Sequence, residues 1–256
     1  MNQIRELVAG TPRLKIKRPL PLSFCQGCQH GAAARVIWEL LEELGLEDRT
    51  IFIGGVTCGS VNAILTDVDC LAPVAHGRAP DIASGMRRLV DDDTIIITYQ
   101  GDGDAIAIGT ESLVQAAARS EKITVFMINN ANYGTTGGQM APTTILGQRT
   151  STTPLGRGKN QEGFPINAAE LVAGLAGTAY SARGSLTSPA NYGKTKKYVK
   201  KALQKQIEKV GFSFVEILSA CPPNWGMTPL ESLKWIDTAL ADQFPLGEFK
   251  DVDSLE

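Results

Sequence analysis

Short apolar runs alternate along the chain with segments of helical periodicity. TIFIGG (50–55), TIIITYQG (94–101), ITVFMINN (123–130) and FSFVEILSA (212–220) are strand-like, and each run leads into glycines or polar residues. Buried parallel strands are continuous apolar runs, and helices join them. The pattern therefore predicts an α/β fold with a mostly parallel sheet and helices on both faces.

Two helices can be placed from their periodicity. Residues 31–44 place apolar side chains on one face, and Gly45 is a suitable C-terminal stop. Residues 195–210 predict a second helix with an apolar stripe and many lysines. Charge opposite an apolar stripe is typical of a solvated outer face, and a docking face for an acidic protein is the alternative.

The length of 256 residues suits one large α/β domain. We expect a single domain over residues 1–256, with extended terminal arms at 1–20 and 245–256. The polar connection 141–163 is rich in proline and glycine and longer than most, so it is expected to be functional or mobile.

Composition excludes several classes of partner. The formal net charge is −2, so no global attraction to nucleic acid or acidic membranes is expected. No run of 18 apolar residues predicts a membrane span, and the N-terminal residues lack the apolar core of a secretory signal. We therefore expect a cytoplasmic protein, whose five cysteines are reduced or metal-bound.

Polar side chains follow two of the predicted strands. Asp102 ends one strand in QGDGD, and Asn130 ends the next. Parallel strands carry their ligands at the carboxyl edge of the sheet, where these side chains could meet. Carboxylate and amide oxygens suit Mg²⁺, and Gly103 with the following helix N-terminus could bind a phosphate. A magnesium–diphosphate site is predicted; the alternative is two ordinary strand-ending turns.

Four cysteines could share the same edge. Cys25 and Cys28 form a C-x-x-C pair, and Cys58 and Cys221 each follow a strand-like run. Four thiolates can hold a [4Fe–4S] cluster. A thiol–disulfide pair, a structural zinc site and small core residues are the alternatives.

The two histidines offer little catalytic chemistry by themselves. His30 follows the cysteine pair and receives no role, and His76 stands in AHGRAP. Since no Ser/His/Asp arrangement or H-E-x-x-H motif is present, the chemistry is expected to belong to cofactors.

Together these motifs carry a resemblance to a known family. GDGD, followed 28 residues after Asp102 by Asn130, resembles the thiamine diphosphate-binding motif. YQGDGDAIAIGTES and NNANYGTTGGQMAPTT resemble the β subunits of 2-oxoacid:ferredoxin oxidoreductases. The similarity extends from Cys25 to about Pro229.

The resemblance implies a set of ligands. Asp102, the Asn130 side chain and the main-chain carbonyl of Asn132 would hold Mg²⁺, and Thr135 would lie near the cofactor. The residues that would shape the diphosphate turn are Gly101, Gly103 and Asp104. A proximal [4Fe–4S] cluster would be held by Cys25, Cys28, Cys58 and Cys221, while Cys70 matches no ligand position. His76 and Arg78 are candidates for the active-site wall, with a purely structural role as the alternative.

The resemblance also implies an activity. The complete enzyme would oxidatively decarboxylate a 2-oxo acid, either a branched-chain one such as 2-oxoisovalerate or 2-oxoglutarate. Coenzyme A would take the acyl group, and ferredoxin the electrons. One set of βαβ units leaves the pyrimidine-binding domain and its activating glutamate to a partner α subunit, possibly fused to a γ subunit. This chain alone should then be inactive.

Two other functions remain open. A non-redox thiamine diphosphate lyase would share the GDG and NN motifs but would need no cluster. A zinc-stabilised assembly protein without catalysis would bind zinc at the cysteines and would not bind thiamine diphosphate.

Overall fold

The computed structural model describes residues 24–66 and 68–255, so the arm expected over residues 1–20 lies outside the described part of the chain. Seven strands form one sheet in the order β2-β1-β3-β4-β6-β5-β7, and all neighbours are parallel except β5 and β7. The strands are β1 (Thr50–Gly54), β2 (Asp69–Leu71), β3 (Ile95–Gly101), β4 (Thr124–Asn129), β5 (Thr178–Ser185), β6 (Phe212–Leu218) and β7 (Gly247–Asp251).

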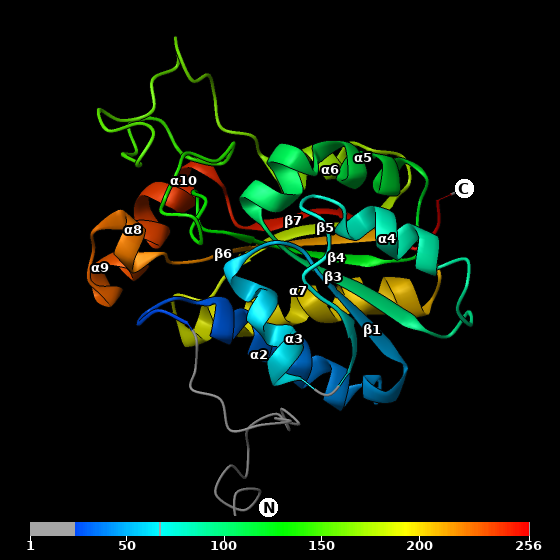
Figure 1. Cartoon of the computed structure of the whole chain (residues 1–256). Helices are drawn as coiled ribbons and strands as arrows, with labels where there is room; N and C mark the ends of the chain where they lie inside the picture. The colour runs from blue at the N-terminus through cyan, green and yellow to red at the C-terminus, as the bar shows by residue number, and fades with distance from the viewer. Residues whose placement is uncertain (1–23, 67, 256) are drawn as a thin grey trace, which may run out of the picture.

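Helices cover both faces of the sheet, as the sequence predicts. In Figure 1, α2, α3 and α7 lie on one face, α4, α5 and α6 lie on the other, and α8, α9 and α10 gather beyond one end. The helices are α2 (His30–Glu43), α3 (Asn62–Leu65), α4 (Ala79–Met86), α5 (Thr110–Ala118), α6 (Ala168–Ala173), α7 (Pro189–Ile207), α8 (Pro222–Trp225), α9 (Pro229–Trp235) and α10 (Ala241–Gln243). Shorter turns are η1 (Glu47–Arg49), η2 (Cys58–Val61) and the π-helical η3 (Asp104–Ile108) and η4 (Ile236–Leu240).

The central strands are mostly apolar because both of their faces are covered. Every residue of β3 is buried. Ile95, Ile97 and Tyr99 join the cluster under α2 and α7, whereas Ile96 joins the cluster under α4, α5 and α6. Alternation between two apolar layers explains why the sequence shows a continuous apolar run rather than a polar–apolar repeat.

The two helices placed from periodicity are confirmed, with different limits for the second. α2 ends just before Gly45, which has φ +63°. α7 begins earlier than expected because Ser188 caps it, accepting a hydrogen bond from the Asn191 N–H at 3.2 Å. It ends before residue 210 because Lys209 adopts φ +57°, a left-handed conformation that stops a helix.

The lysines of α7 are partly neutralised within the chain. Lys196 pairs with Glu39 and Glu43, and Lys201 pairs with Glu248 and Asp251. A face that contacts its own acidic neighbours in this way favours the solvated-surface interpretation over docking.

Residues 245–256 were expected to form an extended arm, and the structure incorporates part of them into the sheet. Strand β7 lies antiparallel to β5 as the edge strand. The hydroxyl of Tyr180 donates to Glu248 at 2.8 Å and ties the two strands together. The polar composition that suggested a free tail belongs to an edge strand with one solvated side.

The connection 141–163 contains no helix or strand, and a single buried side chain determines its path. The guanidinium of Arg157 donates to six main-chain carbonyls, those of Ala141, Pro142, Thr144, Glu162, Gly163 and Phe164. These bonds hold the two ends of the connection together. They add to backbone bonds inside the connection, such as that from the Gly147 N–H to the Arg157 carbonyl at 2.9 Å.

A buried ion-pair network lies beneath the carboxyl ends of β4, β5 and β6. The side chains of Arg183 and Glu216 are both 0% exposed, with Arg183 Nε 2.8 Å from Glu216 Oε2. The other carboxylate oxygen of Glu216 accepts from Asn129 Nδ2 at 2.7 Å. Arg183 also binds Glu170 and lies over the ring of Phe249. The charges are thus compensated in a place that water does not reach.

Removing Glu216 should destabilise the fold severely. Glu216→Ala leaves the buried guanidinium of Arg183 and the amide of Asn129 without their acceptor, and breaking a buried pair costs about 3–5 kcal/mol. The free energy of unfolding in urea measures this loss. Lys201→Ala, which breaks an exposed pair with Glu248, is the control and should cost less than about 1 kcal/mol. Similar losses in both variants would contradict the prediction.

Candidate functional site at the carboxyl edge of the sheet

The two strands that carry the candidate ligands are neighbours in the sheet. β3 pairs with β4 in a register that sets Gly101 opposite Ile128. Asp102 and Asn130 therefore leave adjacent strands at the same edge, as expected from their positions in the sequence. β6 lies on the other side of β4 and brings Cys221 to this edge.

Asp102 is buried at this edge and faces Thr143 of the long connection. The Thr143 hydroxyl donates to its Oδ2. Burial raises the pKa of Asp102 to about 7, even though the bonds from Thr143 and the Gly103 N–H lower it. Such a carboxylate favours a positive neighbour, because a cation would offset the cost of ionising it away from water.

Three potential oxygen ligands converge beside Asp102. One terminal atom of the Asn130 amide lies 3.2 Å from Asp102 Oδ1 and 2.6 Å from the main-chain oxygen of Asn132. If this atom is the amide nitrogen, it donates to both oxygens. If it is the amide oxygen, three oxygens crowd one point, which is the donor set that Mg²⁺ accepts. The arrangement of these residues therefore fits the ion that the resemblance implies.

Ala131 turns the chain so that its two neighbours face the same point. It adopts φ +54°, a left-handed conformation that is unfavourable for alanine. Its N–H donates to Asn129 Oδ1 at 3.0 Å, and its carbonyl accepts from the Thr144 hydroxyl at 2.7 Å. Strained backbone held by surrounding bonds is frequent at functional sites.

The glycines of the GDGD turn are required by close packing. A Cβ on Gly103 would lie 2.3 Å from the ring of Tyr133, and one on Gly101 would lie 2.9 Å from Thr57 Oγ1. The chain becomes helical at Asp102 and passes through the π-helical η3 before α5. The N–H groups expected to bind a phosphate therefore belong to a π-helical turn, a feature often found at functional sites.

Asp104 has a different environment from Asp102. Its carboxylate accepts from Gln100 Nε2 at 2.6 Å, from the Gly77 N–H at 2.9 Å and from the Val56 N–H at 3.2 Å. His76 Nδ1 lies 2.5 Å from its Oδ1. The carboxylate holds together the loops that follow β1 and precede α4, and so supports the GDGD turn from behind.

The two candidates of the HGR segment are occupied by contacts within the chain. His76 contacts Asp104 and sets its ring edge-on to Tyr133, with centroids 6.3 Å apart. Arg78 donates to Asp81 Oδ2 at 3.1 Å and to Ser112 Oγ at 2.8 Å. The geometry gives His76 a place beside the GDGD turn, whereas Arg78 links α4 to α5.

The four expected cysteines also gather at this edge. A Cβ on Gly134 would lie 3.4 Å from Cys58 Sγ and 3.6 Å from Cys221 Sγ. Burial, together with the charges of Cys58, Cys221 and Cys25, raises the pKa of Cys28 to about 12, although a bond from the His30 main chain lowers it. The four thiols are thus close enough to interact, although they come from three separate segments of the chain.

The spacing of these thiols differs from that of a single metal site. Within residues 24–66 and 68–255, no group of three or more His, Cys, Asp or Glu side chains is arranged around one ion. The irons of a [4Fe–4S] cluster occupy separate corners of a cube, so its thiolates lie farther apart than the ligands of one ion. Cys70 lies away at β2, where its thiol faces the Ala63 carbonyl at 3.6 Å.

Thr135 lies against the cysteines. Its Oγ1 is 3.0 Å from Cys58 Sγ. The next segment, 136–139, turns back so that the Tyr133 N–H binds the Gln139 carbonyl at 2.9 Å. Gly134 and Thr135 therefore lie beside Cys58, and Tyr133, the residue before them, contacts Gly103 of the GDGD turn.

His30, which had no expected role, supports the cysteine turns from the core. Its Nδ1 lies 2.9 Å from the Tyr99 hydroxyl, and burial lowers its pKa to about 4, so it is neutral at pH 7. The Tyr99 ring also lies against Gly59, where a Cβ would come within 2.1 Å of it. Tyr99 thereby contacts residues adjacent to both the C-x-x-C pair and Cys58.

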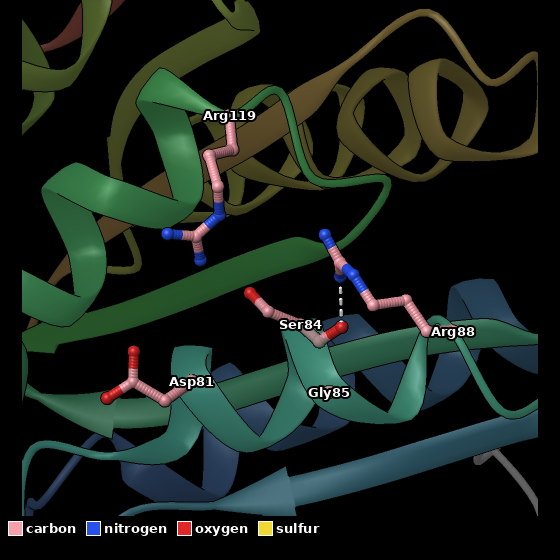
Figure 2. Close-up of a pocket in the computed structure, with 5 residues that line it drawn as sticks. All are labelled: Asp81, Ser84, Gly85, Arg88 and Arg119. Atoms are coloured by element: carbon pink, nitrogen blue, oxygen red, sulfur yellow. Dashed lines mark hydrogen bonds between the residues drawn. The ribbon is translucent and has the colours of Figure 1, made fainter.

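A separate hollow lies on the outer surface between α4 and α5. It measures about 380 Å³ and is lined by Asp81, Ser84, Gly85, Arg88 and Arg119. Figure 2 shows both arginines directed into the same space. Burial raises the pKa of Glu121, but bonds from Arg88 and Arg119 hold it below its ordinary value. The arginines are thus already paired, and the hollow lies apart from the carboxyl edge.

Several site residues have no motif that identifies them. The residues that contact the candidate ligands without an expected role are Thr143, Tyr133, Asn224 and Trp225. The first two lie within NNANYGTTGGQMAPTT, but that motif gave neither of them a role. Trp225 Nε1 donates to the Asn130 carbonyl at 3.2 Å. The contacts of Thr143 with Asp102 and of Trp225 with Asn130 join positions 41 and 95 residues apart, which local sequence patterns do not reveal.

Comparison with known proteins agrees with this fold. Residues 65–217 match the family described as thiamine pyrophosphate enzyme, C-terminal TPP binding domain. A solved 2-oxoglutarate:ferredoxin oxidoreductase from Magnetococcus marinus shares the fold, with a TM-score of 0.78 and 22% identity, covering 95% of this chain and 86% of that one.

Two curated relatives show which group of enzyme subunits the chain resembles. Ketoisovalerate oxidoreductase subunit VorA of Methanothermobacter thermautotrophicus is 38% identical over 91% of this chain and 48% of its own length. The 2-oxoglutarate synthase subunit KorB of Archaeoglobus fulgidus is 32% identical over 84% of this chain and 75% of its own length. The chain thus spans about half the length of the VorA relative.

The match over residues 65–217 identifies the chain as a thiamine pyrophosphate enzyme, C-terminal TPP binding domain. Within that class, the chain belongs to the family of 2-oxoacid:ferredoxin oxidoreductase subunits. In the described part of the chain, the helices are too short or too polar for any of them to cross a bilayer.

Gly103→Ala should destabilise the protein by about 1–3 kcal/mol, because the added methyl would overlap the Tyr133 ring. Thermal unfolding measures the change. Gly193→Ala is the matched control: it lies inside α7 with no atom within 4 Å of the new Cβ, and should stabilise by about 0.5–1 kcal/mol. If Gly103→Ala unfolds at the same temperature as the wild type, the turn has more room than this structure gives it.

Proposed function

We propose that this chain is the β subunit of a 2-oxoacid:ferredoxin oxidoreductase. It would bind Mg²⁺–thiamine diphosphate at Asp102, Asn130 and Asn132 and a proximal [4Fe–4S] cluster at Cys25, Cys28, Cys58 and Cys221. The observation that carries this proposal is the position of Gly134. A Cβ there would lie 3.2 Å from Asn130 Nδ2 and 3.4 and 3.6 Å from two cysteine sulfurs.

The closeness of the two candidate sites favours electron transfer between them. Thiamine diphosphate supplies an electron sink for the removal of CO₂ from a 2-oxo acid, and an iron–sulfur cluster accepts single electrons. One main-chain segment of this chain contacts residues of both ligand sets. A lyase would need the first ligand set alone and would leave the cysteines without a purpose.

The chain's own residues would bind and orient these groups. Thr143 donates to one Asp102 oxygen and leaves the other directed at Asn130. Tyr133 covers Gly103 and donates from its hydroxyl to the Gly103 carbonyl at 3.2 Å. The burial of Asp102 excludes water, which strengthens its interaction with a cation.

The substrate and partners belong to the proposal as well. Identity is higher to the ketoisovalerate relative (38%) than to the 2-oxoglutarate relative (32%), which favours a branched-chain 2-oxo acid over 2-oxoglutarate. The other components would be coenzyme A, ferredoxin and a partner α subunit that carries the pyrimidine-binding domain. The cytoplasmic location stays a prediction from the sequence.

Metal analysis tests the redox function. Anaerobically purified protein should contain about four irons and four acid-labile sulfides per chain, as one [4Fe–4S] cluster requires. Reduction with dithionite should then produce the electron paramagnetic resonance signal of a reduced cluster. Zinc without sulfide would overturn the redox proposal. Thiamine diphosphate binding would then distinguish the lyase from the assembly protein.

Asp102→Asn should separate the two sites. The variant keeps the side-chain shape but loses the charge, so Mg²⁺-dependent binding of thiamine diphosphate to the assembled enzyme should weaken about tenfold or more. Calorimetric titration measures the affinity, and the iron content should not change. Asp93→Asn, at a side chain 72% exposed, is the matched control and should bind normally. Equal affinity in both variants would remove Asp102 from the magnesium site.

A further inference from the structure

Helix α8 follows Cys221 directly and places two hydrogen-bond donors between the candidate sites. Asn224 Nδ2 lies 2.9 Å from the Gly134 carbonyl oxygen and 3.3 Å from Cys221 Sγ. The next residue, Trp225, reaches the Asn130 carbonyl at 3.2 Å. One short helix thereby contacts the cysteine set, the magnesium set and the segment between them.

The orientation of the Asn224 amide follows from its partners. A carbonyl oxygen accepts hydrogen bonds only, so the amide nitrogen must face Gly134. Its two hydrogens then match the two acceptors, the Gly134 oxygen and the Cys221 sulfur. The side chain is also held in place by Gly138, where a Cβ would lie 2.9 Å from Asn224 Cβ.

Cys221 receives more hydrogen bonds than the neighbouring thiols. Burial raises its pKa, whereas bonds from the Asn224 main chain, the Asn224 side chain and the Asn132 side chain lower it. Cys28 has one such bond, from the His30 main chain, and Cys58 lies beside the Thr135 hydroxyl. Asn224 thus supplies Cys221 with a side-chain N–H donor, 3.3 Å from its sulfur.

We propose that Asn224 is a positioning residue that raises the reduction potential of the cluster and fixes the Gly134 carbonyl between the cluster and the cofactor. The inference rests on the proposed function. Reduction adds one electron, and hence one negative charge, to the iron–sulfur core and its thiolates. N–H donors aimed at a ligand sulfur stabilise that charge and so favour the reduced form.

Two variants test the role of the donor. Asn224→Asp keeps the shape that packs on Gly138 and replaces the amide donor with a carboxylate, and Asn224→Ala removes the group. Both should retain iron and sulfide. Both should also shift the reduction potential to more negative values by about 59 mV or more, which is a tenfold change for a one-electron couple. A redox titration followed by electron paramagnetic resonance measures the potential.

Trp225→Phe is the matched control on the same helix. It removes a donor that faces the Asn130 carbonyl and not a sulfur, so the potential should equal that of the wild type. Unchanged potentials in both Asn224 variants would overturn the inference. Loss of iron from both, with iron retained in Trp225→Phe, would also overturn it, because Asn224 would then be needed for cluster assembly. A wild-type protein without iron and sulfide would overturn the proposed function and this inference together.

Discussion

The hydrogen bond between Asn129 and Glu216 holds the end of β4 in place, and the site is arranged around it. Glu216 is fixed by Arg183 within the core, so the Asn129 amide has one allowed position. Its carbonyl oxygen then accepts from the Ala131 N–H and supports the left-handed turn. That turn directs Asn130 and Asn132 to one point. A buried ion pair between strands β5 and β6 thus supports the turn that brings the candidate oxygen ligands together.

The fold and the place of the candidate ligands at one edge of the sheet could be predicted because they depend on local pattern. Buried strands are visible as apolar runs, and the polar residues that end them occupy one edge of a parallel sheet whatever the loops do. Asp102, Asn130 and the four cysteines follow from this geometry with the family motif. The limits of α7 and the pairing of β7 could not be predicted in this way. A capping serine, a left-handed lysine and an edge-strand partner determine them, and these act outside the periodic pattern.

The remaining contacts depend on the tertiary structure. Asp102 and Asp104 stand two positions apart in one motif, yet the first faces the site and the second binds the loops behind it. Thr143 and Asn224 reach the site from segments whose sequences describe only a polar connection and a turn. Thr135 was expected near the cofactor from resemblance, and the structure sets its hydroxyl against Cys58. The direction of each side chain determines which contact it makes, and sequence spacing does not encode that direction.

The guanidinium of Arg157 affects how readily a protease can cut the long connection. Proteases bind their substrates as extended backbone with free carbonyls, and six carbonyls of this segment are already bound to one buried cation. Arg149 and Lys159 are exposed between the two ends of the connection, and Arg157 binds the carbonyl of neither residue. The two ends of a segment whose composition resembles that of a flexible linker are thereby kept from the extended form that a protease binds.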